Sequence, residues 1–402
     1  MAADRPFGPP YWREGDFEEA NGYPRYSAGE LDRRHAWLGA VMAEQEFDGV
    51  VVGGVSAPHD AAVQFFTNWP PGAQSYLVAL PDEAPTLFVR LWNHLPDARL
   101  IAAVDDIRYG GDTPGEQARK VASHLARRGS TKIGMIGTVV HGDLDEFRRS
   151  IPEAEWTDLN PEYQAFRLVK AEEELVYTRI ASSMNDAAVA AMVEQIRPGM
   201  REYELARVIE DVYLAHRAVN LIHFTLSTSM KNPDRFVPHQ HQPDRLLAAG
   251  DVVVTEISTT FWGYSGQILR SFSVAAEPTP HYLELYETAE VAYRAIVDLL
   301  RPGVTIGEIL DAADVIGEAG FGIWDDLVHG FGGGYLPPIL RTRQSRGATH
   351  PDSFAYPEGS LVVVQPNIIS DAAGVQVGNS VWITAEGPQS TQLHPMGFLR
   401  CG

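Results

Sequence analysis

The sequence predicts an α/β (α+β) protein, in which a smaller N-terminal α/β domain with a mixed sheet precedes a larger C-terminal domain made of two related halves. Two observations lead to this fold class. Before residue 160, apolar runs typical of buried strands alternate with helical stretches, as in layered α/β domains. Beyond residue 165, an Arg-Pro-Gly turn occurs twice, at 197–199 and at 301–303. We therefore expect an arm over 1–26, a first domain over 27–165 and a second domain over 166–402.

The first domain opens after a polar stretch that is rich in Pro, Gly and aromatic residues, which we expect to lie as an arm on another surface. Ser27–Glu30 has the pattern of a capping box, so a helix is expected to begin there. A second helix is predicted over Glu116–Arg128. Short apolar runs predict the following strands: Asp48–Gly54, Ser75–Leu80, Thr86–Val89 and Lys132–Ile136.

The second domain contains the duplication. A long helix is expected from Ala171, with Glu172–Glu174 favouring the positive end of its dipole. Each Arg-Pro-Gly turn then leads into a helical stretch and a strand: first Glu202–Leu214 and Ala249–Glu256, then Ile306–Ile316 and Glu358–Gln365. Two copies are too few for a solenoid, so the pattern indicates a pseudo-twofold domain. Glu256 and Gln365 become counterparts at the ends of two central strands, and ligand sites often lie between such halves.

Composition limits the partners of this chain. Its 402 residues carry 53 acidic against 32 basic side chains and a formal charge of −21, which disfavours nucleic acid and membrane surfaces. No run approaches the ~18 apolar residues of a membrane-spanning helix, and the N-terminus has no signal-peptide core. Cys401 is the single cysteine, so no intrachain disulfide can form. We expect a cytoplasmic protein without nucleic-acid or membrane partners.

Histidines cluster in the second domain. His239 and His241 have the spacing that can present two imidazoles on one face of a strand, a weak metal-ligand signal whose alternative is a solvated loop. His329 precedes several glycines, which would let the backbone approach a ligand closely. His223 lies in an apolar, strand-like run and has a structural role as its simpler interpretation.

Several motifs, taken in order, resemble one superfamily. They are Arg167-Leu-Val-Lys170, Arg197-Pro-Gly-Met200 with Glu202, Pro238-His239, Gly250–Val254, Gly263-Tyr264 with Arg270-Ser-Phe272, His329–Gly332 and Gly359–Pro366. Together they resemble the pita-bread superfamily of Xaa-Pro aminopeptidase, prolidase, methionine aminopeptidase and creatinase. The first 160 residues are similar to the smaller N-terminal domain of the prolidase and creatinase branch. The resemblance implies a pita-bread fold for residues 166–402 and a homodimer.

The metallopeptidases of this superfamily hold two divalent ions with two Asp, one His and two Glu. The resemblance places these ligands at Glu256, Gln267, His329, Gln365 and Gly378, so three of the four carboxylates are missing. One carboxylate and one imidazole cannot neutralise two dications. We therefore expect no metal and no other cofactor.

This pattern favours the creatinase-like branch, whose members hydrolyse carbon–nitrogen bonds of small molecules without metal. The hypothesis is a metal-independent hydrolase of an amide, amidine or ureido compound, with His239 as general acid/base. Glu256 and His329 would orient water and substrate, while Gln267 and Gln365 would hydrogen-bond the substrate. The alternatives are a divergent lyase or decarboxylase, a non-catalytic binding homologue and a residual metallopeptidase. For Glu256, a purely structural pairing with Arg270 also remains open.

Further residues are expected to line the pocket. His223, His241 and Tyr264 are candidate substrate contacts. Arg341 and Arg343, with Arg346, follow a Pro-Pro pair and could clamp a carboxylate, since guanidinium binds it bidentately; a solvated basic loop is the alternative. Trp69 lies where the resemblance implies a loop that reaches a dimer partner, although packing within its own domain is the simpler interpretation.

Overall fold

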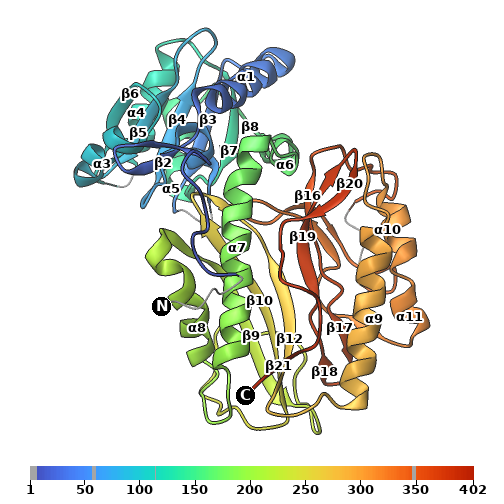
Figure 1. Cartoon of the computed structure of the whole chain (residues 1–402). Helices are drawn as coiled ribbons and strands as arrows, with labels where there is room; N and C mark the ends of the chain where they lie inside the picture. Colours follow the sequence, from blue (N-terminus) through green and yellow to red (C-terminus); the bar gives the residue numbers. More distant parts are fainter. Residues whose placement is uncertain (1–6, 57–59, 114, 346–349) are drawn as a thin grey trace. The chain divides into compact units, whose positions relative to one another are not determined.

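The chain divides into two units, each with its own sheet. The computed structural model describes residues 7–56, 60–113, 115–345 and 350–402. The smaller unit comprises Glu14–Phe166, and the larger comprises the segment that ends at Arg13 together with Arg167–Gly402 (Figure 1). Part of the expected arm therefore belongs to the smaller unit, where β1 (Glu18–Ala20) and β2 (Tyr23–Arg25) form a two-stranded sheet.

The smaller unit is a mixed six-stranded sheet with helices. In spatial order its strands are β6 (Asp106–Gly111), β5 (Thr86–Arg90), β4 (Ser75–Ala79), β3 (Gly49–Gly54), β7 (Lys132–Gly137) and β8 (Glu155–Asp158). The pairs β3–β4 and β4–β5 are antiparallel, whereas β5–β6, β3–β7 and β7–β8 are parallel. The helices are α1 (Ala28–Gln45), α2 (Ala62–Thr67), α3 (Leu95–Ile101), α4 (Glu116–Ala126), α5 (His141–Ser150) and α6 (Asn160–Leu168), the last ending in the larger unit. The expected mixed-sheet domain is confirmed.

Local sequence explains where its elements begin. Ser27 caps α1, because its hydroxyl accepts a hydrogen bond from the Glu30 backbone N–H at 3.1 Å.

Trp69 is 6% exposed, as expected for a residue that packs inside its own domain. The sequence did not predict β6 and β8, which are the two edge strands.

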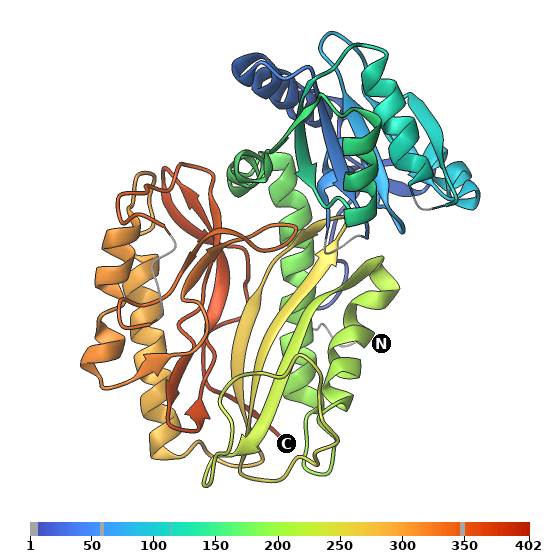
Figure 2. The same cartoon turned by 180° about the vertical axis from the view of Figure 1, so that it is seen from behind.

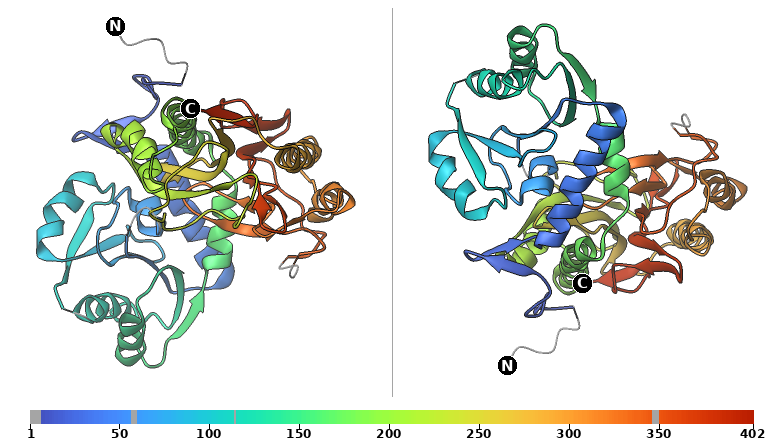
Figure 3. Two further views of the ribbon diagram at one scale, coloured as in Figure 1. Left: turned by 90° about the horizontal axis from the view of Figure 1, so that it is seen from below. Right: turned by 90° about the horizontal axis from the view of Figure 1, so that it is seen from above.

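The larger unit is a ten-stranded, largely antiparallel sheet. Its first half contains β9 (Ala218–Ser229), β10 (Asp251–Phe261), β11 (Tyr264–Ser265) and β12 (Ile268–Val274). The second half contains β14 (Val328–Gly330), β15 (Leu336–Leu340), β16 (Leu361–Val364), β19 (Gly378–Thr384) and β20 (Gly387–Ser390), while β21 (Leu399–Cys401) pairs with β12. A separate small sheet consists of β13 (Gly322–Ile323), β17 (Ile368–Ser370) and β18 (Ala373–Gly374). The two halves meet where β12 pairs with β19 (Figures 2 and 3).

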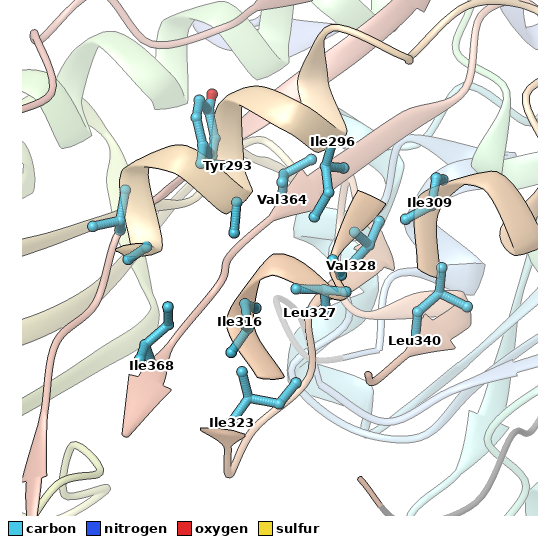
Figure 4. Packing of buried hydrophobic residues seen from close by; sticks show 14 of the residues in the cluster. Tyr293, Ile296, Ile309, Ile316, Ile323, Leu327, Val328, Leu340, Val364 and Ile368 are labelled. Carbon is cyan, nitrogen blue, oxygen red and sulfur yellow. The ribbon is translucent and has the colours of Figure 1, made fainter. Parts of the chain in front are cut away.

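Helices pack on each half of this sheet. Helix α7 (Glu172–Gln195) contacts β10 and β12, and α8 (Glu204–Tyr213) contacts β9. The second half has α9 (Pro280–Val297), α10 (Ile306–Ala312) and α11 (Val315–Glu318). Ile296, Ile309, Val328 and Val364 belong to the core beneath these helices (Figure 4). In both halves a long helix and a shorter one precede the strands, as the expected duplication predicts, and the second half adds the short helix α11. No helix of the described residues is long and apolar enough to cross a membrane.

Candidate active site

Strand register places Glu256 and Gln267 on one face of the central sheet. Glu256 of β10 pairs with Leu269 of β12. Because side chains alternate along a strand, Gln267, two residues before Leu269, faces the same side. The Gln267 amide nitrogen donates a hydrogen bond to Glu256 Oε1. Both residues are buried, with Gln267 fully enclosed.

The second half of the domain contributes the matching pair. His329 of β14 pairs with Val363 of β16, and Gln365 lies two residues beyond Val363. Val363 packs with Leu269 and Phe331 in one small apolar cluster, so these side chains lie on the face that carries Glu256. The structure therefore brings together four residues expected from the sequence: Glu256, Gln267, His329 and Gln365.

Three residues not expected from the sequence complete the group. Asp326 Oδ2 accepts a hydrogen bond from the Tyr335 hydroxyl and one from Gln365 Nε2 at 3.4 Å. The backbone N–H of Asp326 donates to Asp325 Oδ1 at 2.9 Å. We call this group the buried polar cluster; its members are Glu256, Gln267, Asp325, Asp326, His329, Tyr335 and Gln365. The sequence signal that could have identified Asp325 and Asp326 is that they form an adjacent pair of acids just before an apolar strand.

Burial and like charges shift the acids of this cluster. The pKa of Glu256 lies well above its ordinary value, because the side chain is desolvated and Asp325 and Asp326 are nearby. Burial, reinforced by Asp326, raises the pKa of Asp325 to about 7. Desolvation lowers the pKa of His329 to about 4. The cluster thus combines an acid, Glu256, whose pKa is raised with an imidazole, His329, whose pKa is lowered.

Three polar atoms of the cluster have no partner. His329 Nδ1 lies 2.9 Å from the Gly330 carbonyl, so it carries the proton and Nε2 is an acceptor. Nε2 makes no hydrogen bond, and neither do Gln267 Oε1 and Gln365 Oε1, although all three are buried. Buried polar atoms are normally paired, so three open acceptors in one place can bind donors of a ligand or of water.

His239 lies at the edge of the sheet. Its backbone N–H donates to Thr225 of β9 at 2.9 Å. Its Nδ1 lies 3.0 Å from Glu202 Oε1, and its Nε2 lies 3.3 Å from Arg235 NH1. The His239 side chain is 27% exposed, whereas that of Glu202 is fully buried. No hydrogen bond within the described part of the chain joins His239 to the buried polar cluster.

Two expected substrate contacts lie elsewhere. His223 pairs with Ile257, one residue from Glu256, so its side chain faces the opposite side of the sheet, where Tyr213 of α8 packs against it. Burial there lowers the pKa of His223 to about 3. The Tyr264 hydroxyl donates to Glu174 of α7 at 2.7 Å. Both residues pack between sheet and helices, which corrects their expected role.

The arginine loop and His241 are also separate from the cluster. Arg343 forms ion pairs with Asp311 at 2.7 Å and Asp352 at 2.8 Å, so its guanidinium is engaged. Arg341 is exposed and lines a cavity of about 200 Å³ that shares no residue with the cluster. His241 is exposed, and Arg346 lies outside the described residues.

Two structural interpretations are settled by contacts. Arg270 pairs with Thr255 in the ladder and bonds Gly378 O and Asn379 Oδ1, each at 3.0 Å, so it does not pair with Glu256. Three of the glycines after His329, namely Gly330, Gly332 and Gly333, pack closely on other parts of the protein itself. A Cβ on Gly332 would lie 2.2 Å from Lys170 Cε. Their close backbone approach is therefore explained without a ligand.

The residues at the five metal positions implied by the resemblance do not fit a two-metal centre. Gln267 and Gln365 are neutral amides whose nitrogens point to acids of the cluster. A Cβ on Gly378 would lie 2.6 Å from Val364 O and 2.8 Å from Leu269 Cδ1, so the fifth position has no room for a side chain. Among the described residues, no three His, Cys, Asp or Glu are arranged to hold a metal ion.

Known proteins with similar sequence and structure include Xaa-Pro dipeptidases and an X-Pro aminopeptidase. The chain is 24% identical over 330 residues to an Xaa-Pro dipeptidase of Pyrococcus horikoshii, covering 81% of this chain and 88% of that protein. It is 26% identical to an Xaa-Pro dipeptidase of Lactobacillus delbrueckii, covering 89% and 95%. The X-Pro aminopeptidase structure of Thermotoga maritima superposes with a TM-score of 0.78 at 20% identity, covering 91% and 99%. The predicted pita-bread fold is confirmed.

The family model that matches is that of metallopeptidase family M24, over residues 177–385, which is more than half of the chain. The expectation of a hydrolase that acts on carbon–nitrogen bonds agrees with this match. The expectation of a metal-independent, creatinase-like enzyme is wrong, because the matched family is one of metallopeptidases and these relatives are Xaa-Pro dipeptidases. By this match the chain belongs to metallopeptidase family M24.

Proposed function

We propose that this chain hydrolyses a carbon–nitrogen bond of a small, peptide-like substrate at the buried polar cluster. The observation that carries the proposal is the unpartnered Nε2 of His329, a fixed acceptor in a group that also contains Glu256, a buried acid whose pKa is raised. Two titratable groups whose pKa values are pushed apart supply a base and an acid at the same pH. The similarity to Xaa-Pro dipeptidases favours a short peptide as substrate.

The proposed roles follow from the free atoms. His329 Nε2 takes a proton from water as the water oxygen bonds to the substrate carbonyl carbon. The carbon–nitrogen bond then breaks, and the leaving nitrogen takes a proton from Glu256. Gln267 Oε1 and Gln365 Oε1 accept hydrogen bonds from substrate N–H groups. The proton on His329 finally returns to Glu256 through solvent, which restores the starting state. No step is assigned to a metal, because the residues at those positions do not fit one.

We assign His239 the transfer of protons between solvent and the cluster. Glu202, fully buried, holds Nδ1, while the imidazole is partly exposed. A carboxylate that binds one imidazole nitrogen fixes the orientation of the ring, as is required of a histidine that transfers protons. The homodimer and cytoplasmic location expected from the sequence remain part of the proposal; light scattering of the purified protein tests the dimer.

The test uses a variant matched to His329. Asn at 329 keeps a donor for the Gly330 carbonyl and lacks the Nε2 acceptor. We expect His329→Asn to lower kcat by about 10²–10⁴-fold and Glu256→Gln by a similar factor. His141→Asn, at an 88% exposed histidine side chain, is the control and keeps full activity. The assay uses Xaa-Pro dipeptides and small ureido and cyclic amidine compounds, with Mn²⁺ or Co²⁺ supplied.

The outcomes separate the alternatives. Hydrolysis by His329→Asn at the wild-type rate contradicts the proposed base. Release of CO₂ without amine, or binding without turnover, would favour the decarboxylase or the non-catalytic homologue. Loss of activity in His239→Ala alone, with His329→Asn active, would move the chemistry to the edge of the sheet.

A further inference from the structure

Asp326 is the acid of the buried polar cluster with the most fixed position. Its Oδ2 receives the Tyr335 hydroxyl and Gln365 Nε2, and the residue is 3% exposed. Tyr335 itself is 42% exposed, so this side chain connects the buried acid with solvent. Two donors from different strands and loops hold one carboxylate oxygen in place.

His329 is fixed just as firmly, by different contacts. Nδ1 is bound to the Gly330 carbonyl at 2.9 Å. The imidazole stacks on the Tyr335 ring, with centroids 3.9 Å apart and planes tilted by 21°. Tyr335 therefore touches both groups: its ring supports His329 and its hydroxyl supports Asp326.

His329 Nε2, which has no partner, faces Asp326 Oδ2, which already accepts hydrogen bonds from Tyr335 and Gln365, across a short gap. His329 Nε2 and Asp326 Oδ2 are 3.7 Å apart, which is too long for a direct hydrogen bond. Two acceptors would also not attract one another without a donor between them. A single water can lie about 2.8–3.0 Å from both atoms, and a buried water needs two to four polar partners. Nε2 is buried without any partner, which is the independent sign that a donor belongs there.

We propose that Asp326 Oδ2 and His329 Nε2 together bind the attacking water, which makes Asp326 a further catalytic residue of this chain. The inference rests on the proposed function for its chemical meaning. Water donates one hydrogen to each acceptor and keeps an oxygen lone pair directed at the carbonyl carbon. Its first proton passes to Nε2 as the new carbon–oxygen bond forms, and Asp326 accepts the hydrogen bond from the second. Asp326 thereby supplies a carboxylate to a site where Gln365 is neutral.

The experiment combines kinetics with a high-resolution crystal structure. Asp326→Ala is expected to lower kcat by about 10²-fold with KM changed less than threefold. Asp326→Asn, whose amide oxygen still accepts, is expected to lose about tenfold. Tyr335→Phe keeps the stack and removes one donor, so its loss is smaller again. Asp311→Asn, at an exposed acid, is the control.

The structure decides independently of activity. We expect an ordered water bound to both Nε2 and Oδ2 in the wild type and absent in Asp326→Ala. A direct bond between the two side chains, or no water in contact with both, overturns the proposal even if no variant folds or no substrate is found. Wild-type kcat in a folded Asp326→Ala also overturns it. If His329→Asn is inactive while Asp326→Ala is fully active, only this inference fails and the proposed function stands.

Discussion

Gly378→Ala tests whether the fifth metal position has closed. An added Cβ would lie 2.6 Å from Val364 O, 2.8 Å from Leu269 Cδ1 and 3.1 Å from Gln365 Cα. Ordinary contacts are about 3.5–4.0 Å, so the backbone of β16 or β19 has to move by roughly 1 Å. Overpacking of this kind costs about 1–3 kcal/mol, and strain on the β16–β19 ladder adds about 1 kcal/mol. We expect a loss of about 2–4 kcal/mol.

Urea unfolding followed by circular dichroism measures this change. The control is Gly322→Ala in β13, another strand glycine of the larger unit, whose Cβ would meet nothing within 4 Å. That substitution should change the free energy of unfolding by less than about 1 kcal/mol. Equal stability of the two variants would refute the reasoning, because it would mean that β16 and β19 can separate at no cost. A carboxylate at 378 would then be sterically possible.

Three further predictions concern stability. Asp325→Asn should stabilise the protein by about 2–4 kcal/mol at pH 8 and not at pH 4. The fold raises the pKa of Asp325 to about 7, so the protonated carboxyl contributes stability that is fully present below about pH 4 and is lost as the pH rises through 7. Thermal melts across this pH range check the prediction. Ile296→Ala should cost about 2–5 kcal/mol in urea unfolding, because a fully buried side chain leaves a cavity under α9. Tyr264→Phe should cost about 1–2 kcal/mol, since Glu174 loses a buried hydrogen bond; an unchanged melting temperature would contradict the contact.

The sequence predicted the central elements of the fold well and its edges poorly. Apolar runs such as Ser75–Leu80 identify strands that are buried on both faces, and the structure has β4 there. Strand β6 (Asp106–Gly111) carries charged residues and glycine at half-buried or buried positions, and β8 (Glu155–Asp158) has exposed acids at both ends; each is an edge strand. Their polar composition resembles that of loops, so periodicity alone does not reveal them.

The sequence predicted only those site residues whose positions along the strands follow from the superfamily motifs. Glu256, Gln267, His329 and Gln365 meet in the structure, as expected from their order along the superfamily motifs. Asp326 and Tyr335 reach the cluster through the loops on either side of the short strand β14, and loop geometry is not encoded in a strand pattern.

Strand alternation explains the errors as well as the successes. The sequence indicates the two strands that contain His223 and Glu256. Whether these two side chains lie on the same face of the sheet depends on the register between the strands. The ladder pairs Glu256 with Phe224, and His223 consequently faces α8. The same rule separates Glu256 from Arg270, which pairs with Thr255. A slip of one residue would reverse both outcomes. Identifying the partner of a buried acid therefore needs the register, and in this chain that partner is Gln267, an amide that leaves one oxygen free for a ligand.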